Sequence, residues 1–329
     1  IEVEVDVTNS LPGMSIVGLP DNAVSEARER VHSAIKNSGY TFPTGKVIVN
    51  LAPADIRKEG TNYDLPIAVG ILKEQGIDIP DDNNTAFLGE LSLDGNLRKV
   101  NGILPLVSGL KENGITTVFV PEENAREAAL VKDMVILGVK HLADIAGHYT
   151  ENPIKPTVID INEYLARNAN TDFSYDFKDV KGQVKAKKAL EIAAAGGHNI
   201  LMSGSPGSGK TLMAKCLASI LPPLELKEAL ELTKIYSISG LLSPDEPLMT
   251  KRPYRSVHHT ASSNSIIGGG SNPKPGEITL AHRGVLFLDE MVEFPRHVLE
   301  VLRQPLEDGE VVGVRKKKNF KKKGLFFLI

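Results

Sequence analysis

The sequence predicts an α/β protein of two domains, and three observations support this prediction. The chain has 329 residues, which indicates two domains at roughly 150 residues per domain. Hydrophobic residues make up 41% of the chain and charged residues 24%, as in ordinary soluble globular proteins. Strand-like and helix-like stretches alternate along the chain, which is typical of α/β folds. A mainly disordered or fibrous chain is thereby excluded.

The sequence also excludes several other classes of protein. No stretch approaches the roughly 18 apolar residues of a membrane span, so we expect no membrane association. The alternating residues 1–6 indicate a strand and not a signal peptide. Cys216 is the only cysteine, which excludes a disulfide framework and a cysteine-based zinc site. We therefore expect a reducing, cytoplasmic setting.

The first domain is predicted over residues 1–148. Its clearest helix signal runs from Asp21, which can cap the first turn, to Ser38, before Gly39. A hairpin turn is expected at Asp94-Gly95, between Leu93 and Leu97. The strand signals include the runs Lys46–Leu51, Phe87–Leu93 and Thr117–Val120.

A linker is predicted over residues 149–176, where proline, asparagine and threonine replace periodic patterns, apart from a short helix near Asn162–Arg167. The second α/β domain then covers residues 177–329. It is expected to begin with a helix over Val184–Ala195 and an apolar strand over Asn199–Ser203.

A phosphate-binding loop follows that apolar run. Its residues match the pattern G-x-x-x-x-G-K-[ST]: Gly204, Ser205, Pro206, Gly207, Ser208, Gly209, Lys210 and Thr211. The glycines allow backbone N–H groups to turn toward phosphates, and the next helix would point its N-terminus at them. Lys210 would contact the β- and γ-phosphates, and the Thr211 hydroxyl would bind magnesium. We therefore predict that the protein binds ATP and Mg²⁺.

Two acidic residues are candidates for the chemistry of hydrolysis. Asp289 and Glu290 follow the apolar run Gly284–Leu288, and at the carboxyl end of a parallel strand they would face the nucleotide. Asp289 would hold magnesium, and Glu290 would activate the attacking water. Lys210 and Asp289 lie 79 residues apart, which is long for one crossover. Residues 262–284 are rich in glycine and polar residues, and we expect them to form an inserted loop or hairpin.

Histidines raise the alternative of a metal site. His258 and His259, together with His282, could be ligands, but adjacent residues point apart on a strand and no carboxylate or cysteine lies at ligand spacing in the sequence. We therefore favour packing or a subunit interface for these histidines.

These motifs resemble the ComM/YifB family of magnesium-chelatase-like AAA+ ATPases. The resemblance covers nearly the whole chain. It is carried by residues 11–20, 50–60, 204–211, 255–262, 268–270, 275–278, 280–290 and 302–310. It implies a ribosomal-protein-like α+β first domain, similar to the terminal domains of Lon protease and RadA, followed by a P-loop AAA+ domain that is truncated at its C-terminus. It further implies that Val180, Gly182 and Gln183 lie near the adenine.

The resemblance also implies a ring-forming ATPase, often hexameric, that moves DNA, as in branch migration. Members continue past residue 329 into a sensor asparagine, an arginine finger and a helical lid. We therefore expect this chain to bind nucleotide, and we expect hydrolysis to depend on those further parts. A nucleotide-switched scaffold and a chelatase-type remodelling ATPase without DNA remain alternatives. Proteolysis is not expected, because Asn62 and Leu104 stand where Lon-type proteases have the catalytic serine and lysine.

Positive charge is concentrated in the last residues of the sequence. The net charge is −3, and residues 311–329 contain seven basic and no acidic residues, which leaves −10 on residues 1–310. We consider two interpretations, a solvated surface and a sequence-independent contact with DNA phosphates. The candidate DNA contacts are Arg315, Lys316, Lys317, Lys318, Lys321, Lys322 and Lys323.

Overall fold

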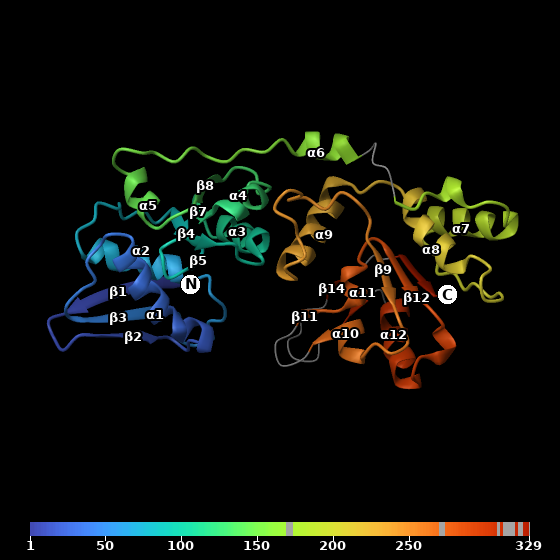
Figure 1. Ribbon diagram of the computed structural model, residues 1–329, viewed down its shortest axis with the longest axis horizontal. Helices are drawn as coiled ribbons and strands as arrows, with labels where there is room; N and C mark the ends of the chain where they lie inside the picture. The colour runs from blue at the N-terminus through green and yellow to red at the C-terminus, as the bar shows by residue number, and fades with distance from the viewer. Residues whose placement is uncertain (169–173, 270–273, 308–309, 312–319, 322–324, 329) are drawn as a thin grey trace. The chain divides into compact units, whose positions relative to one another are not determined.

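The computed structural model describes residues 1–168, 174–269, 274–307, 310–311, 320–321 and 325–328 (Figure 1). The chain divides into two compact units. Unit 1 comprises Ile1–Ile159 together with Ser243–Pro247, and unit 2 comprises Asp160–Leu242 together with Leu248–Ile329. Both units combine helices with parallel strand pairs, so the prediction of a mixed α/β protein is confirmed.

Unit 1 contains two three-stranded sheets, ordered β1-β3-β2 and β4-β7-β8. In the first sheet β3 is antiparallel to β1 and parallel to β2, whereas the second sheet is entirely parallel. The strands are β1 (Glu2–Thr8), β2 (Gly13–Val17), β3 (Lys46–Ala52), β4 (Thr85–Phe87), β5 (Glu90–Leu91), β6 (Leu97–Arg98), β7 (Thr117–Pro121) and β8 (Val135–Val139). The helices are α1 (Asn22–Asn37), α2 (Asp64–Glu74), α3 (Ile103–Glu112), α4 (Glu122–Ala128) and α5 (Ala143–His148).

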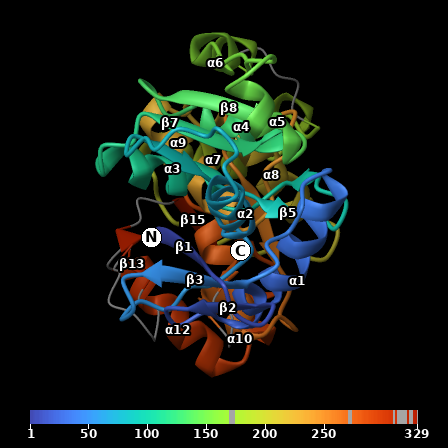
Figure 2. The same cartoon turned by 90° about the vertical axis from the view of Figure 1, so that its left-hand side faces the viewer.

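The helix α1 begins and ends where the sequence predicts. The Asp21 carboxylate accepts a hydrogen bond from Val24 N at 2.8 Å, which satisfies one of the N–H groups left unpaired in the first turn. Val24, Val31 and Ile35 on one face of α1 are fully buried. The helix α2 lies close to β1 because Gly70 has no side chain; a Cβ there would be 2.5 Å from Val5 Cγ2. Figure 2 shows α1 and α2 beside the β1-β3-β2 sheet.

The predicted strand over Phe87–Leu93 is wrong as a single element. Leu88 N donates to Phe119 O at 2.9 Å and thus ends the β4–β7 ladder, and Leu91 then pairs with Leu97 in an antiparallel hairpin. The predicted turn is confirmed within that hairpin, because Gly95 has φ +89° and its N–H donates to Ser92 O. The apolar run is therefore divided between two sheets, with Phe87 in β4 and Leu91 in β5.

Unit 2 is built on the parallel sheet β15-β12-β9. The strands are β9 (Tyr254–Val257), β10 (Gly268–Gly269), β11 (Lys274–Pro275), β12 (Val285–Leu288), β13 (Glu310–Val311), β14 (Phe320–Lys321) and β15 (Leu325–Leu328). The α-helices are α6 (Ile161–Asn168), α7 (Val184–Gly196), α8 (Lys210–Leu217), α9 (Leu226–Ile238), α10 (Ser263–Ile267), α11 (Glu277–Leu280) and α12 (Arg296–Glu307), and single 3₁₀ turns are η1 (Phe177–Asp179), η2 (Ala218–Ile220) and η3 (Met291–Glu293).

The apolar run before the phosphate-binding loop is not a strand, contrary to the prediction. Residues 199–203 have no strand assignment in the structure, although their side chains alternate. Ile200 and Met202 pack against the core that contains α7 and α8, whereas Leu201 is 71% exposed. The alternation is that of a strand, but a strand also needs a hydrogen-bonded neighbour, and residues 199–203 pair with no strand among the described residues.

The inserted segment does contain a hairpin, as predicted. β10 and β11 pair antiparallel, with Gly268 opposite Pro275. Within the described residues, no helix is long and apolar enough to cross a membrane.

Candidate functional site

The last two residues of the phosphate-binding loop, Lys210 and Thr211, are the first two residues of α8. Gly207 and Gly209 have φ angles of +78° and +88°, and Gly209 caps α8. No atom lies within 4 Å of the position of a Cβ on either glycine. The backbone conformation at these two positions therefore favours glycine, and the space over them is open. The free N–H groups of the first turn of α8 make this end of the helix suited to an anion.

Lys210 folds back over its own loop. Its Nζ donates to Gly204 O at 2.9 Å and to Ser205 O at 3.2 Å. A second contact closes the loop, because Ser208 N donates to Ser205 O at 3.2 Å. The ammonium group is thus held beside the loop carbonyls at the helix N-terminus, where a phosphate would compete for it.

The three residues expected near the adenine lie in the turn before α7. Gln183 has φ +47° and its Nε2 donates to Ser208 O at 3.3 Å, so this turn contacts the phosphate-binding loop directly. Gly182 also has a positive φ, of +65°. Val180 is only 4% exposed, and its carbonyl accepts from Lys187 Nζ at 3.1 Å. The structure therefore places Gln183 at the loop and Val180 in the core below it.

The two candidate acids follow β12, which packs directly against α8. Phe287 of β12 contacts Ala214, and Val285 belongs to the cluster that contains Met213 and Cys216. Asp289 N donates to Val257 O at 3.3 Å and so extends the β9–β12 ladder by one residue. The chain turns sharply at the next residue, since Glu290 has φ +55° and an exposed side chain.

The geometric argument against a histidine site is wrong. His258 and His259 lie beyond the end of β9, where a turn begins at His259, so the alternation of a strand does not separate them. Their ring centroids are 4.0 Å apart. His259 Nδ1 also lies 3.3 Å from Glu290 Oε2. A carboxylate is thus present after all, supplied by the neighbouring strand. His282 is elsewhere, with its Nε2 3.6 Å from Glu231 Oε2.

The side chains of the basic run, residues 315–323, have no described positions. Arg315, Lys316, Lys317, Lys318, Lys322 and Lys323 lie outside the described residues. Lys321 is described by its backbone alone, as the last residue of β14, opposite Glu310 of β13. The pairing of β13 with β14 is antiparallel, and the chain between them contains four of the seven basic residues.

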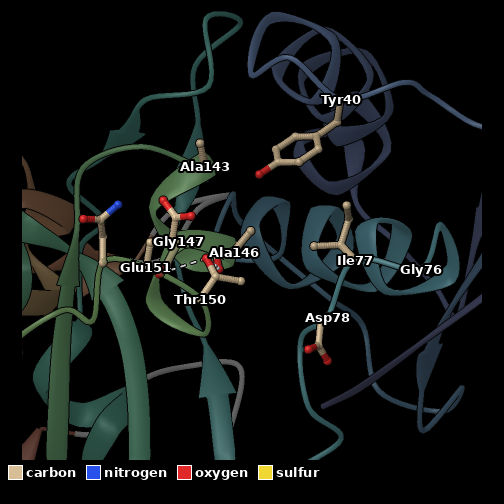
Figure 3. A pocket seen from close by; sticks show the side chains of 10 residues that line it. Tyr40, Gly76, Ile77, Asp78, Ala143, Ala146, Gly147, Thr150 and Glu151 are labelled. Atoms are coloured by element: carbon tan, nitrogen blue, oxygen red, sulfur yellow. Dashed lines mark hydrogen bonds between the residues drawn. The ribbon is translucent and has the colours of Figure 1, made fainter.

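Unit 1 has a separate cavity, of about 470 Å³, at the surface (Figure 3). Its polar side chains come from Tyr40, Asp78, Thr150, Glu151 and Asn152. The positions that correspond to the Lon dyad do not line it. Leu104 is 1% exposed within α3, and the Asn62 carbonyl accepts from Gly89 N at 3.3 Å.

Comparison with known proteins decides the family. A family model described as magnesium chelatase, subunit ChlI, matches residues 176–329, and one described as subunit ChlI of Mg-chelatase matches residues 3–124. YifB of Salmonella typhimurium is 44% identical over 322 residues, which cover 94% of this chain and 60% of YifB. Competence protein ComM of Haemophilus influenzae is 41% identical over 315 residues, covering 95% of this chain and 61% of ComM. The chain belongs to the magnesium-chelatase-like family of YifB and ComM. The predicted resemblance is confirmed.

Part of the chain is also similar, at lower sequence identity, to a protease. Lon protease 2 of Bacillus subtilis is 28% identical over 141 residues, which cover 41% of this chain and 25% of the protease. The chain spans about 60% of the length of YifB and ComM.

Proposed function

We propose that this chain is the ATP-binding part of an AAA+ ATPase that acts on DNA. The observation that carries the proposal is the geometry of the phosphate-binding loop. Two glycines with positive φ lead into the N-terminus of α8, and Lys210 is held beside them by loop carbonyls. Family membership supports nucleotide binding independently.

The residues of the loop fit a nucleotide with magnesium. The space over Gly207 and Gly209 is open, and a phosphate there would receive the N–H groups of α8 and the Lys210 ammonium. Thr211 and Asp289 would hold Mg²⁺, which when bound neutralises phosphate charge. Glu290 would take a proton from the attacking water. Gln183, already bonded to Ser208, would lie with Val180 and Gly182 on the adenine side.

The proposed division of the chain places this chemistry in one domain. Residues 1–148 would form a Lon-like domain without proteolytic activity, because an amide and an alkyl group at Asn62 and Leu104 provide neither nucleophile nor base. Residues 149–176 would be the linker, and residues 177–329 the ATP-binding part of the AAA+ module.

The DNA substrate is supported by two observations. One relative is named a competence protein, and the basic run contrasts with the −10 net charge of residues 1–310. Such a run binds phosphates without reading sequence. We further propose that the full-length protein assembles into a ring, with six subunits as the expected number, and moves along DNA.

The test is ATP turnover by the full-length protein, measured without DNA and with single-stranded, duplex and branched DNA. The proposal predicts turnover that DNA stimulates and that Lys210→Ala abolishes. ATP binding without turnover would instead support a nucleotide-switched scaffold. Turnover indifferent to every DNA would support a chelatase-type remodelling ATPase.

A further inference from the structure

The carboxyl ends of two neighbouring strands bring three metal-ligating side chains together in unit 2. β9 and β12 are parallel, with Val257 opposite Leu288, so the residues after them leave the sheet at the same edge. His258, His259 and Glu290 each offer one ligand atom there, and these atoms all lie within 4.8 Å of one another.

One nitrogen of this group has no hydrogen-bond partner. His259 Nδ1 is buried, and among the described residues no group forms a hydrogen bond with it. It nevertheless lies 3.3 Å from Glu290 Oε2, so the two atoms face each other without the alignment of a hydrogen bond. A buried nitrogen left in this state costs free energy, and a cation between the two atoms would satisfy both.

The spacing fits a specific kind of cation. Tetrahedral zinc binds nitrogen and oxygen at about 2.0–2.2 Å, which puts two of its ligands about 3.4 Å apart. The nitrogen–oxygen distance of 3.3 Å matches this value. Two imidazoles and one carboxylate are a ligand set that zinc uses with water in the fourth position, whereas magnesium prefers oxygen ligands alone.

One of the two histidine rings, that of His258, is also supported from outside the group. The Thr260 hydroxyl lies 3.0 Å from His258 Nδ1, and outer hydrogen bonds of this kind orient histidines that bind metals. Thiolate competition is absent, because Cys216 is the only cysteine in the sequence and is fully buried.

We propose that His258, His259 and Glu290 bind one divalent transition metal of the zinc type, and that the bound metal inhibits ATP hydrolysis. The inhibitory part rests on the proposed function, in which Glu290 accepts a proton from water. A carboxylate that donates its electron pair to a metal is a poorer base. The metal site itself rests only on the geometry of the three side chains.

Binding is tested on the metal-free 329-residue chain without nucleotide, by competition with a chromophoric zinc chelator in millimolar Mg²⁺. The wild type should bind one equivalent of Zn²⁺. His259→Ala and Glu290→Gln should each lower the affinity for Zn²⁺ at least tenfold. The matched control is His198→Ala, which removes an exposed histidine of the same unit outside the group and should change nothing. Equal affinity in wild type and Glu290→Gln would overturn the proposal; because that side chain is 60% exposed, this variant tests the proposal even if His259→Ala fails to fold.

Two further readouts separate this inference from the proposed function. Co²⁺ in place of Zn²⁺ should give the intense visible absorption of a four-coordinate site in the wild type, and weak absorption would contradict the geometry. In the full-length protein, one equivalent of Zn²⁺ should lower ATP turnover at least fivefold in excess Mg²⁺. An ATP turnover rate that does not change when zinc binds would overturn the inhibitory role. Tight zinc binding in a protein that shows no ATP turnover at all would count against the proposed function alone.

Discussion

Lys210 Nζ donates a hydrogen bond to Gly204 O at 2.9 Å, so the lysine of the phosphate-binding loop is bonded to the loop's own first residue. A carbonyl is a neutral acceptor, whereas a phosphate oxygen is charged, and charge-assisted hydrogen bonds are roughly twice as strong. An arriving nucleotide can therefore exchange this contact for a stronger one. The lysine is itself the first residue of α8, whose N-terminus would receive the phosphates.

Replacing Glu290 by glutamine should separate nucleotide binding from hydrolysis in the full-length protein. Glutamine keeps the size of the side chain but cannot accept a proton, so turnover should fall by about 10²- to 10⁴-fold while ATP affinity stays within about twofold. Steady-state turnover and equilibrium binding measured on the same preparation check this. Unchanged turnover would move the catalytic role to another residue.

The basic run should contact DNA phosphates directly. Replacing Lys316, Lys317 and Lys318 by alanine should flatten the plot of log affinity against log salt by up to about three units, because each neutralised phosphate releases a counterion. A DNA-binding titration over a salt series, on full-length protein with nucleotide, measures the slope. The control replaces three exposed lysines elsewhere, Lys140, Lys178 and Lys188. Equal slopes for both triple variants would show that the run is only a solvated surface.

A buried ion pair should stabilise unit 1. The Asp64 carboxylate is fully buried and accepts from Arg30 Nε at 2.7 Å and Nη2 at 3.0 Å, and from Leu91 N at 3.2 Å. Asp64→Asn removes the countercharge, and the free energy of unfolding should fall by about 2–4 kcal/mol. Glu26→Gln is the control, since Glu26 meets the same arginine at 3.8 Å on the surface and should cost less than about 1 kcal/mol. Urea denaturation of the wild type and both variants measures these free energies of unfolding, and equal losses for the two variants would contradict the role of the buried pair.

The hairpin turn after β5 should respond to acid. The Asp94 carboxylate accepts hydrogen bonds from the Ser92 hydroxyl and from Asn96 N and Nδ2, and these bonds lower its pKa to about 2. Because the pKa is lower in the folded state, the stabilisation is present above pH about 4 and is lost as the pH falls toward 2. The stability difference between wild type and Asp94→Ala should therefore shrink over that window in denaturant titrations. A difference independent of pH would contradict this reading of the turn.

Local signals predicted the parts of the structure that depend on neighbouring residues. Asp21 caps α1 because its carboxylate reaches the N–H three residues ahead, and that spacing is visible in the sequence. The same holds for the phosphate-binding loop, whose glycines and lysine form one continuous motif. The turn at Gly95 was likewise predictable, since it requires only a residue that tolerates positive φ.

Features that depend on distant pairing were missed. Glu290 and His259 lie 31 positions apart in the sequence and meet only because β9 and β12 pair in parallel. No spacing rule for single segments reveals that contact. The run from Ile200 to Met202 has strand-like alternation, yet the sequence does not show whether a neighbouring strand pairs with it. The apolar run thus predicted an extended segment against the core, but not the absence of a hydrogen-bonded neighbour.

The most direct test of the central claim is calorimetric binding of Mg-ATP to this chain, compared between the wild type and Lys210→Ala. The matched control is Lys215→Ala, which removes a lysine from the same helix whose Nζ lies over the Tyr175 ring, 4.8 Å from its centroid. The account predicts that Lys210→Ala weakens binding by roughly 1.5–3 kcal/mol, through loss of a charge-assisted phosphate contact, and that the control binds like the wild type. Equal affinity of the wild type and Lys210→Ala would contradict nucleotide binding at this loop.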